Sequence, residues 1–258
     1  MVIVIMKVVL LQRDIAWGSP QDNLSQLDSA LERNPGADLY VLPEMFTTGF
    51  ATLPDATVEE EPSAGLAWMK AAAARTNAAI AGSIALRTAE GCRNRFYFVK
   101  PDGCVTVYDK RHLFTYGGEK ERFGAGRDKA IVEWRGWRFL LTVCYDLRFP
   151  VWLRNRDDYD AIICVANWPD KRRYHWDTLL RARAIENQCY VLGVNRVGTD
   201  PVCNYNGGTV LLDPYGNAVS ACPDNTQFEC SGEFDKKLIQ DYRAKFPVLE
   251  DADTFEII

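Results

Sequence analysis

The sequence predicts an α/β fold with two β-sheets in a single domain. Apolar runs of strand length alternate with longer segments in which apolar residues recur at helical spacing. Two hairpins are expected as well, around the turn residues 101–103 and 213–217. Since hairpins mix with connections long enough to be crossover helices, two sheets are favoured over one. No repeat, low-complexity segment or Pro/Ser-rich linker interrupts residues 1–258, so they are interpreted as one domain.

In the first half of the chain, the period of the apolar residues assigns each element. Leu24, Leu27 and Leu31 recur at helical spacing, and residues 64–76 are alanine-rich, so both segments are predicted helices. Residues 115–129 carry glycines and mixed charge and are expected to form a covering loop. In chain order the predicted elements are a strand at 6–11, a helix at 23–34, a strand at 39–42, a helix at 64–76, a strand at 78–86, and hairpin strands at 95–100 and 104–109.

The second half continues the alternation. A strand at 138–143 leads to Cys144, and a helix is expected next because Pro150 suits a first turn and Asp146 can cap it. Further predicted elements are strands at 159–166 and 189–195, a hairpin within 208–220, and a helix at 174–188 with Trp176, Leu179, Leu180 and Ile185 on one face. Residues 246–258 are expected to be a tail that packs on the body or on a partner subunit.

The composition is that of an ordinary soluble protein, with 47% hydrophobic and 25% charged residues. The formal net charge of -5 and the absence of a basic stripe argue against a dedicated nucleic-acid binder. The apolar run Val2–Leu11 is interrupted by Lys7 and is too short to span a bilayer. It has neither a basic leader nor a small-residue cleavage site, so a buried strand and a cytoplasmic protein are expected.

The cysteine pattern gives no sign of a metal centre. The eight cysteines are scattered without a CxxC pair, and only two histidines, His112 and His175, are available. A zinc site of the usual type is therefore unsupported, and neither a metal nor a cofactor is expected. Most of these thiols are interpreted as small buried hydrophobes.

Three chemically active residues follow three of the predicted strands. Glu44 comes after the run 40–43, Lys110 after the run 105–109, and Cys144 after the run 141–143. Singly, each has an ordinary interpretation: a solvated turn residue, a surface charge and a buried thiol. Together they are harder to dismiss, because parallel strands deliver their C-terminal residues to one shared crevice. The three positions predict a catalytic triad without histidine.

The chemistry of these three side chains is complementary. A thiol with an ordinary pKa near ~8.5 is mostly protonated at neutral pH, so a base or a cation must generate the thiolate. Glu44 can take that proton if it is withdrawn from water. Lys110 can stabilise the thiolate and donate a hydrogen bond to the oxyanion formed when the thiolate attacks a carbonyl.

The segments around these residues resemble the signature segments of the nitrilase superfamily of carbon–nitrogen hydrolases, most closely its omega-amidase branch. Leu42-Pro43-Glu44-Met45-Phe46, the run 108–114 and the run 145–150 after Cys144 carry the likeness. Residues 167–169, 181–187 and 193–198 are also similar to that branch. The likeness extends from about residue 6 to the turn at 213–216, so residues 1–5 are interpreted as an extension or an upstream start.

The resemblance implies a four-layer αββα sandwich with two mixed β-sheets flanked by helices, dimerising through its helical faces. It implies Glu44 as the base, Lys110 as the oxyanion stabiliser and Cys144 as the nucleophile. The backbone N–H of Tyr145 would be the second oxyanion donor. A second family glutamate in the loop after the lysine fits Glu119 best. Glu121 is a close alternative for this position. The ordinary interpretation of either residue is a solvated glutamate in a loop.

The resemblance also implies the substrate class. Omega-amidases hydrolyse the terminal amide of short dicarboxylic monoamides such as 2-oxoglutaramate and 2-oxosuccinamate. The free carboxylate of such a substrate calls for a cation, preferably a forked guanidinium. Arg173 is the chosen candidate for this role, and the adjacent Arg172 is an alternative. Arg148 lies near the nucleophile but is interpreted as structural, tied to Asp146 or the helix start. Further substrate-binding candidates are Phe50, whose alternative is plain core, Asn167 and Trp168.

Three other interpretations stay open. Another branch of the family would use the same triad on a nitrile or a carbamoyl amide. A papain-like enzyme would pair His112 with Cys144, although it would not need Glu44 or Lys110 at strand ends. A non-catalytic dimeric scaffold would require the triad to be vestigial.

Overall fold

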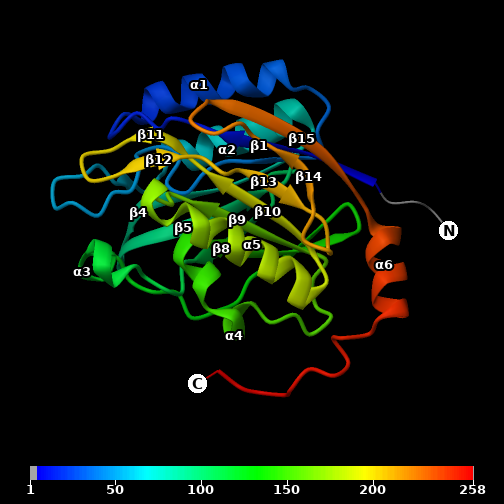
Figure 1. Ribbon diagram of the computed structural model, residues 1–258. Helices are drawn as coiled ribbons and strands as arrows, with labels where there is room; N and C mark the ends of the chain where they lie inside the picture. The colour runs from blue at the N-terminus through cyan, green and yellow to red at the C-terminus, as the bar shows by residue number, and fades with distance from the viewer. Residues whose placement is uncertain (1–4, 258) are drawn as a thin grey trace.

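The computed structural model describes residues 5–257 and contains two large β-sheets (Figure 1). The first sheet has the strand order β15-β1-β2-β4-β5-β6, and the short β3 pairs with β4. Strand β1 is parallel to β2, β2 and β3 are parallel to β4, and the other neighbours are antiparallel. Its strands are β1 (Ile5–Gln12), β2 (Leu39–Val41), β3 (Glu59–Glu60), β4 (Ala79–Thr88), β5 (Gly91–Val99), β6 (Val105–Asp109) and β15 (Phe228–Asp235).

The second sheet has the order β14-β13-β10-β9-β8-β7, and its three central strands are parallel. Its strands are β7 (Ile131–Trp134), β8 (Trp137–Val143), β9 (Ala161–Ala166), β10 (Tyr190–Asn195), β13 (Val210–Leu212) and β14 (Ala218–Ala221). A separate two-stranded ribbon contains β11 (Val197–Thr199) and β12 (Asn204–Asn206).

The alternation of side chains along the first sheet produces two cores. In β1, Val8 and Leu10 join the core shared with the second sheet, whereas Val9 and Leu11 face the helices α1 (Pro20–Arg33) and α2 (Ala64–Thr76). Between the sheets the ring of Phe98 stacks on that of Phe139, with centroids 6.0 Å apart. The first sheet is therefore buried on both faces.

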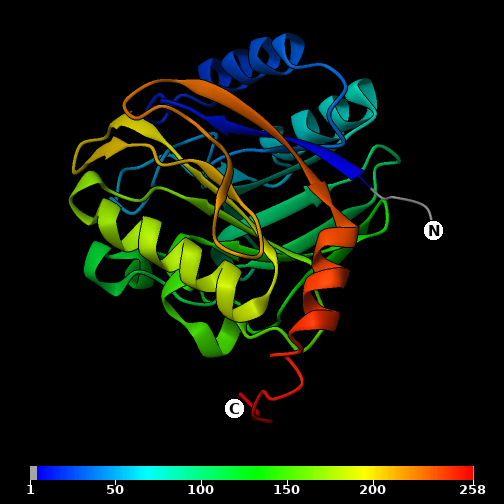
Figure 2. The same cartoon turned by 45° about the vertical axis from the view of Figure 1, so that its right-hand side comes forward.

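Helices also cover the second sheet. Trp176 and Leu180 of α5 (Arg173–Asn187) are buried in the core of that sheet. The helix α6 (Lys236–Lys245) follows β15 and buries Ile239. Figure 2 shows α1 and α2 on one side of the paired sheets and α5 on the other. The predicted four-layer αββα sandwich is confirmed.

Most predicted elements are confirmed with shifts of one to three residues at their ends. The segment 115–129 is not simply a loop, because it contains the short helices η1 (Thr115–Gly117) and α3 (Glu119–Arg122). The helix expected after Cys144 is two short helices, η2 (Cys144–Arg148) and α4 (Pro150–Leu153). As predicted, Asp146 caps η2, by accepting a hydrogen bond from the N–H of Val143, and Pro150 begins α4.

Other expectations need correction or were missing. Ile185 is 49% exposed and does not share the buried face of α5. Strands β7 and β15 and helix α6 were not predicted. The tail packs on the body, because Gln188 Nε2 donates to the carbonyl oxygen of Phe246 at 2.7 Å and Arg156 donates to that of Phe255. The interpretation of residues 1–5 as an extension falls outside the described residues, except for Ile5 at the start of β1.

No helix within residues 5–257 combines the length and the apolar character needed to cross a membrane.

Candidate functional site

The three predicted catalytic residues lie just beyond the ends of strands from both sheets. Glu44 follows β2 and Lys110 follows β6, two strands of the first sheet that run in the same direction. Cys144 follows β8 of the second sheet. All three residues follow strand ends, as expected, but these strands belong to two different sheets. The sandwich is what brings the thiol to the charged pair.

Lys110 is held between two glutamates inside the protein. Its Nζ donates to Glu44 Oε1 at 2.9 Å and to Glu119 Oε2 and Oε1 at 2.8 and 3.0 Å. All three side chains are 0% exposed. Glu121, the alternative second glutamate, is exposed on α3 and makes no such contact. The structure therefore brings Glu119 to the triad and leaves Glu121 outside it.

Asn94 is a member of this cluster that the sequence analysis missed. Its Nδ2 donates to Glu44 Oε1 at 2.7 Å and to Glu119 Oε1 at 3.0 Å, so one amide group links both carboxylates. Its backbone carbonyl accepts from the N–H of Lys110 at 3.0 Å. Asn94 lies on β5, which was predicted to start only at Arg95. An asparagine in a strand gave no local sign of catalytic contact.

Cys144 occupies a strained position between β8 and η2. Its φ of 46° lies in the left-handed region, which L-residues avoid unless the surroundings enforce it. The same strand-to-helix turn is used elsewhere to expose a nucleophile. Tyr145 is the second residue of η2, where a backbone N–H has no partner within the helix. The thiol and this N–H therefore stand next to each other at a 3₁₀-helix start.

Asp146 fixes that turn to the end of β6. It is fully buried, and its carboxylate accepts from the N–H of Val143 at 3.0 Å, the hydroxyl of Tyr108 at 2.8 Å and the N–H of His112 at 3.0 Å. The ring of His112 also binds Asp146, through Nδ1 at 2.8 Å, and stacks on Phe149. Since the His112 ring is committed to Asp146, the structure gives no support to a papain-like pair with Cys144.

The buried charges determine the protonation of the cluster. Burial alone would lower the pKa of Lys110, but the charges of Glu119 and Glu44 raise it well above its ordinary value. Burial raises the pKa of Glu119, against the opposing charge of Lys110. Burial and then the charge of Glu44 raise the pKa of Cys144 well above its ordinary value. The resting cluster thus combines an ammonium with a neutral thiol, so Cys144 must lose its proton during the reaction.

The predicted substrate-binding residues Asn167, Trp168 and Phe50 differ in how they contact the cluster. Asn167 donates its backbone N–H to Glu44 Oε2 at 2.7 Å and its Nδ2 to the Glu44 carbonyl at 2.8 Å. Its Oδ1 is buried without a partner. Trp168 is buried, and its N–H donates to Asn195 Oδ1 at 2.7 Å. The ring of Phe50 lies 5.6 Å from Lys110 Nζ and so forms a wall of the site.

Of the three arginines considered, Arg173 is placed away from the triad. It donates to Asp177 and to Asp224, both at 2.8 Å. Arg172 instead lies over the ring of Phe114, with 5.3 Å between its guanidinium carbon and the ring centroid. The Phe114 ring in turn contacts that of Tyr145, at 5.1 Å.

Arg148 makes neither of the contacts expected of it. It lies over the ring of Trp168 at 4.8 Å and approaches His175 Nδ1 at 3.1 Å, whereas Asp146 binds other groups. The interpretation that Arg148 is tied to Asp146 is therefore wrong.

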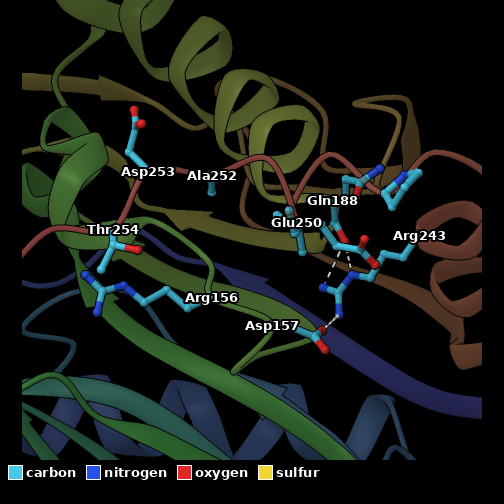
Figure 3. A pocket seen from close by; sticks show the side chains of 10 residues that line it. Arg156, Asp157, Gln188, Arg243, Glu250, Ala252, Asp253 and Thr254 are labelled. Atoms are coloured by element: carbon cyan, nitrogen blue, oxygen red, sulfur yellow. Dashed lines mark hydrogen bonds and ion pairs between the residues drawn. The ribbon is translucent and has the colours of Figure 1, made fainter.

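A cavity of about 330 Å³ lies beside α6 and the C-terminal tail (Figure 3). Its walls include Arg156, Gln188 and Arg243, and Figure 3 shows the Arg243 guanidinium directed at Asp157. No predicted site residue lines it. Among residues 5–257 no group of three or more His, Cys, Asp or Glu side chains is arranged to hold a metal ion.

Comparisons with known proteins show the family of this chain. Residues 7–244 match the carbon–nitrogen hydrolase family. The omega-amidase YafV of Escherichia coli (strain K12) is 47% identical over 253 residues, covering 98% of each chain. The 2-oxoglutaramate amidase of Bacillus subtilis (strain 168) is 34% identical over 248 residues, covering 93% of this chain and 95% of that protein. XC1258 from Xanthomonas campestris, a CN-hydrolase superfamily protein solved with an arsenic adduct in its active site, has a TM-score of 0.95 and 41% identity, covering 100% of both chains.

Proposed function

This chain belongs to the carbon–nitrogen hydrolase family, in its omega-amidase branch, and we propose that it hydrolyses the terminal amide of short dicarboxylic monoamides through a thioester on Cys144. The observation that carries the proposal is the Lys110 ammonium fixed between Glu44 and Glu119 beside that thiol. A related omega-amidase and a 2-oxoglutaramate amidase, both aligned over most of the chain, support this substrate class.

In the first half of the reaction, Glu44 takes the thiol proton as the Cys144 sulfur attacks the amide carbon. Negative charge then develops on the carbonyl oxygen. Lys110 Nζ and the Tyr145 N–H donate to that oxyanion, and loss of one such donor typically costs roughly 3–4 kcal/mol of transition-state stabilisation. Glu44 passes its proton to the nitrogen, the C–N bond breaks, ammonia leaves, and the acyl group stays on Cys144 as a thioester.

In the second half, water replaces ammonia. Glu44 removes a proton from the water, whose oxygen attacks the thioester carbon while the same donors hold the oxyanion. The C–S bond breaks, the sulfur regains its proton from Glu44, and the carboxylic acid leaves. Asn167 holds both the carboxylate and the backbone of Glu44, which keeps the base in position for the two proton transfers.

The remote carboxylate of the substrate needs a cation, and Arg172 is the better placed of the two adjacent arginines. Arg173 is already paired with two aspartates. Arg172 lies over Phe114, which contacts Tyr145 at the nucleophile turn. We therefore assign the carboxylate-binding role to Arg172 instead of Arg173.

The first test is ammonia release from 2-oxoglutaramate, with succinamate, glutamine and a simple nitrile alongside, for wild type and Cys144→Ala. Turnover of the oxo-amide that disappears in the variant is expected. A protein trapped during turnover should also carry the mass of the acyl group only when Cys144 is present. Turnover of the nitrile or another amide alone would keep the triad and reject the proposed substrate class.

A second test separates the arginines. Arg172→Ala should raise KM for 2-oxoglutaramate at least tenfold, since a charged hydrogen bond to the substrate is lost, and change the rate with a neutral amide little. Arg173→Ala is the matched control and should leave both unchanged. An unaltered KM in Arg172→Ala would reject the role.

A further inference from the structure

A second pair of thiols, Cys222 and Cys230, lies at the edge of the sandwich, on adjoining segments of the two sheets. Cys222 follows β14 of the second sheet, and Cys230 lies in β15 of the first. These strands pack together, and a Cβ built on Gly232 would lie 3.5 Å from the Cβ of Ser220. The chain reverses between them. Cys222 and Cys230 are each two residues nearer the turn than Ser220 and Gly232, so the reversal brings their segments together.

The spacing at this edge suits a disulfide. Cβ atoms of disulfide-linked cysteines are about 3.5–4.5 Å apart, and the backbones come close enough two residues further along for a Cβ built on Gly232 to lie 3.5 Å from Ser220 Cβ. Cys222 Sγ lies 3.8 Å from the carbonyl oxygen of Phe228, which keeps it close to β15. Gln12 Nε2 donates to the carbonyl of Pro223 at 2.7 Å and so holds the connecting turn.

The two thiols influence each other. A hydrogen bond from Cys222 lowers the pKa of Cys230, and the same contact followed by burial raises the pKa of Cys222. The guanidinium of Arg13 acts on Cys222 in the opposite direction, toward the thiolate. A pair in which one sulfur holds the proton and the other is the better thiolate is the usual arrangement of a reactive dithiol.

Cys222 also has a route to solvent. Cys222 lines a cavity of about 160 Å³ whose other walls include Arg173 and Arg181. Both cysteines are otherwise buried, at 7% and 3% exposure. A large reagent is therefore excluded, whereas a molecule as small as hydrogen peroxide can enter through the cavity.

We propose that Cys222 and Cys230 form a redox-active dithiol, which hydrogen peroxide converts to an intramolecular disulfide joining the edges of the two sheets. One sulfur attacks a peroxide oxygen, so an S–O bond forms, the O–O bond breaks and the first water leaves. The second sulfur attacks the sulfenic sulfur, so the S–S bond forms, the S–O bond breaks and the second water leaves. Two thiols are oxidised and one peroxide is reduced. The site is separate from Cys144 and does not depend on the proposed amidase reaction.

The test uses the full-length Cys144→Ala protein, in which the proposed catalytic thiol is absent. It is treated with about one equivalent of hydrogen peroxide, alkylated after denaturation and cleaved on the N-terminal side of aspartate. That cleavage places Cys203 in residues 200–212, Cys222 in residues 213–223 and Cys230 in residues 224–234. Mass spectrometry should find the last two peptides joined by one disulfide that dithiothreitol reverses.

Internal controls come from lone buried thiols and from single variants. Burial raises the pKa of Cys164 to about 12, so this thiol should remain reduced and alkylatable after denaturation. Cys222→Ser and Cys230→Ser should each abolish the linked peptide pair. Recovery of both peptides unlinked, linkage of either one to Cys203, or over-oxidation of Cys222 with Cys230 free would overturn the proposal.

Discussion

Lys110 and Arg173 are each flanked by two carboxylates, yet only Lys110 is withdrawn from water together with both partners. Lys110 lies between Glu44 and Glu119, with all three side chains 0% exposed. Arg173 pairs with Asp177 and Asp224, whose side chains are 43% and 53% exposed. Each group contains one positive and two negative charges, so the two groups differ in how far water reaches them.

Burial changes what such a group can do. Exposed ion pairs are screened by water and typically contribute about 0–1 kcal/mol. A buried charge has no water to replace a lost partner, so its partners control protonation and reactivity. Around Lys110 the pKa values of Glu119 and Cys144 are both raised. Arg173, in contrast, only joins α5 to the turn beside Cys222.

The largest expected effect comes from removing the buried cation. Lys110→Met leaves Glu44 and Glu119 facing each other and removes an oxyanion donor. We expect kcat to fall by at least about 10²–10³-fold and the free energy of unfolding to fall by about 3–5 kcal/mol. Ammonia release and denaturant unfolding measure the two quantities. A folded variant, checked by circular dichroism, whose kcat stays within tenfold of wild type would contradict this role.

Removing one buried carboxylate should have the next largest effect. Glu119→Gln keeps the shape but loses the charge that holds Lys110 and one acceptor of the Phe114 N–H. We expect kcat to drop by about 10²-fold, comparable to losing one charged hydrogen bond of about 2–3 kcal/mol. Glu121→Gln on the same short helix is the matched control, and its kcat should stay within twofold. Equal losses in both variants would reject the distinction between the two glutamates.

A smaller effect concerns the thiol itself. Because burial and then the charge of Glu44 raise the pKa of Cys144, the thiol stays protonated at neutral pH. Glu44→Gln removes that negative charge, so the thiolate becomes easier to form. The pH midpoint for iodoacetamide alkylation of Cys144 should move down, while amide hydrolysis is lost. An unmoved or higher midpoint, measured by peptide mapping across pH, would show that Glu44 does not act on the resting thiol.

The smallest effect is expected at Arg173, whose side chain is 23% exposed and whose two partners are more exposed still. Arg173→Ala removes two solvated ion pairs, so the free energy of unfolding should change by less than about 1 kcal/mol. KM for 2-oxoglutaramate should stay within twofold of wild type. A several-fold increase in KM would restore Arg173 as a substrate-binding residue and weaken the contrast with Lys110.

Local pattern was enough to predict the elements that carry the site. The runs that end before Glu44, Lys110 and Cys144 are short, apolar and bounded by turn residues, and each is a strand in the structure. The resemblance to a family then implied the sandwich and favoured Glu119 over Glu121. Strand β15 and helix α6 were not predicted, although β15 alternates apolar or small residues with polar ones along residues 228–235.

The sequence by itself determined which residues stand at strand ends and how each strand divides its side chains between two faces, because both depend on near neighbours in the chain. Only the tertiary structure decided that Asn94 links two carboxylates, that Asp146 holds His112, and that Arg173 lies outside the site. These contacts join residues far apart in sequence, and they depend on how two sheets pack and how much water they exclude. Burial is a property of the packed sandwich, which explains why a cation and two carboxylates are withdrawn from water around Lys110 but partly solvated around Arg173.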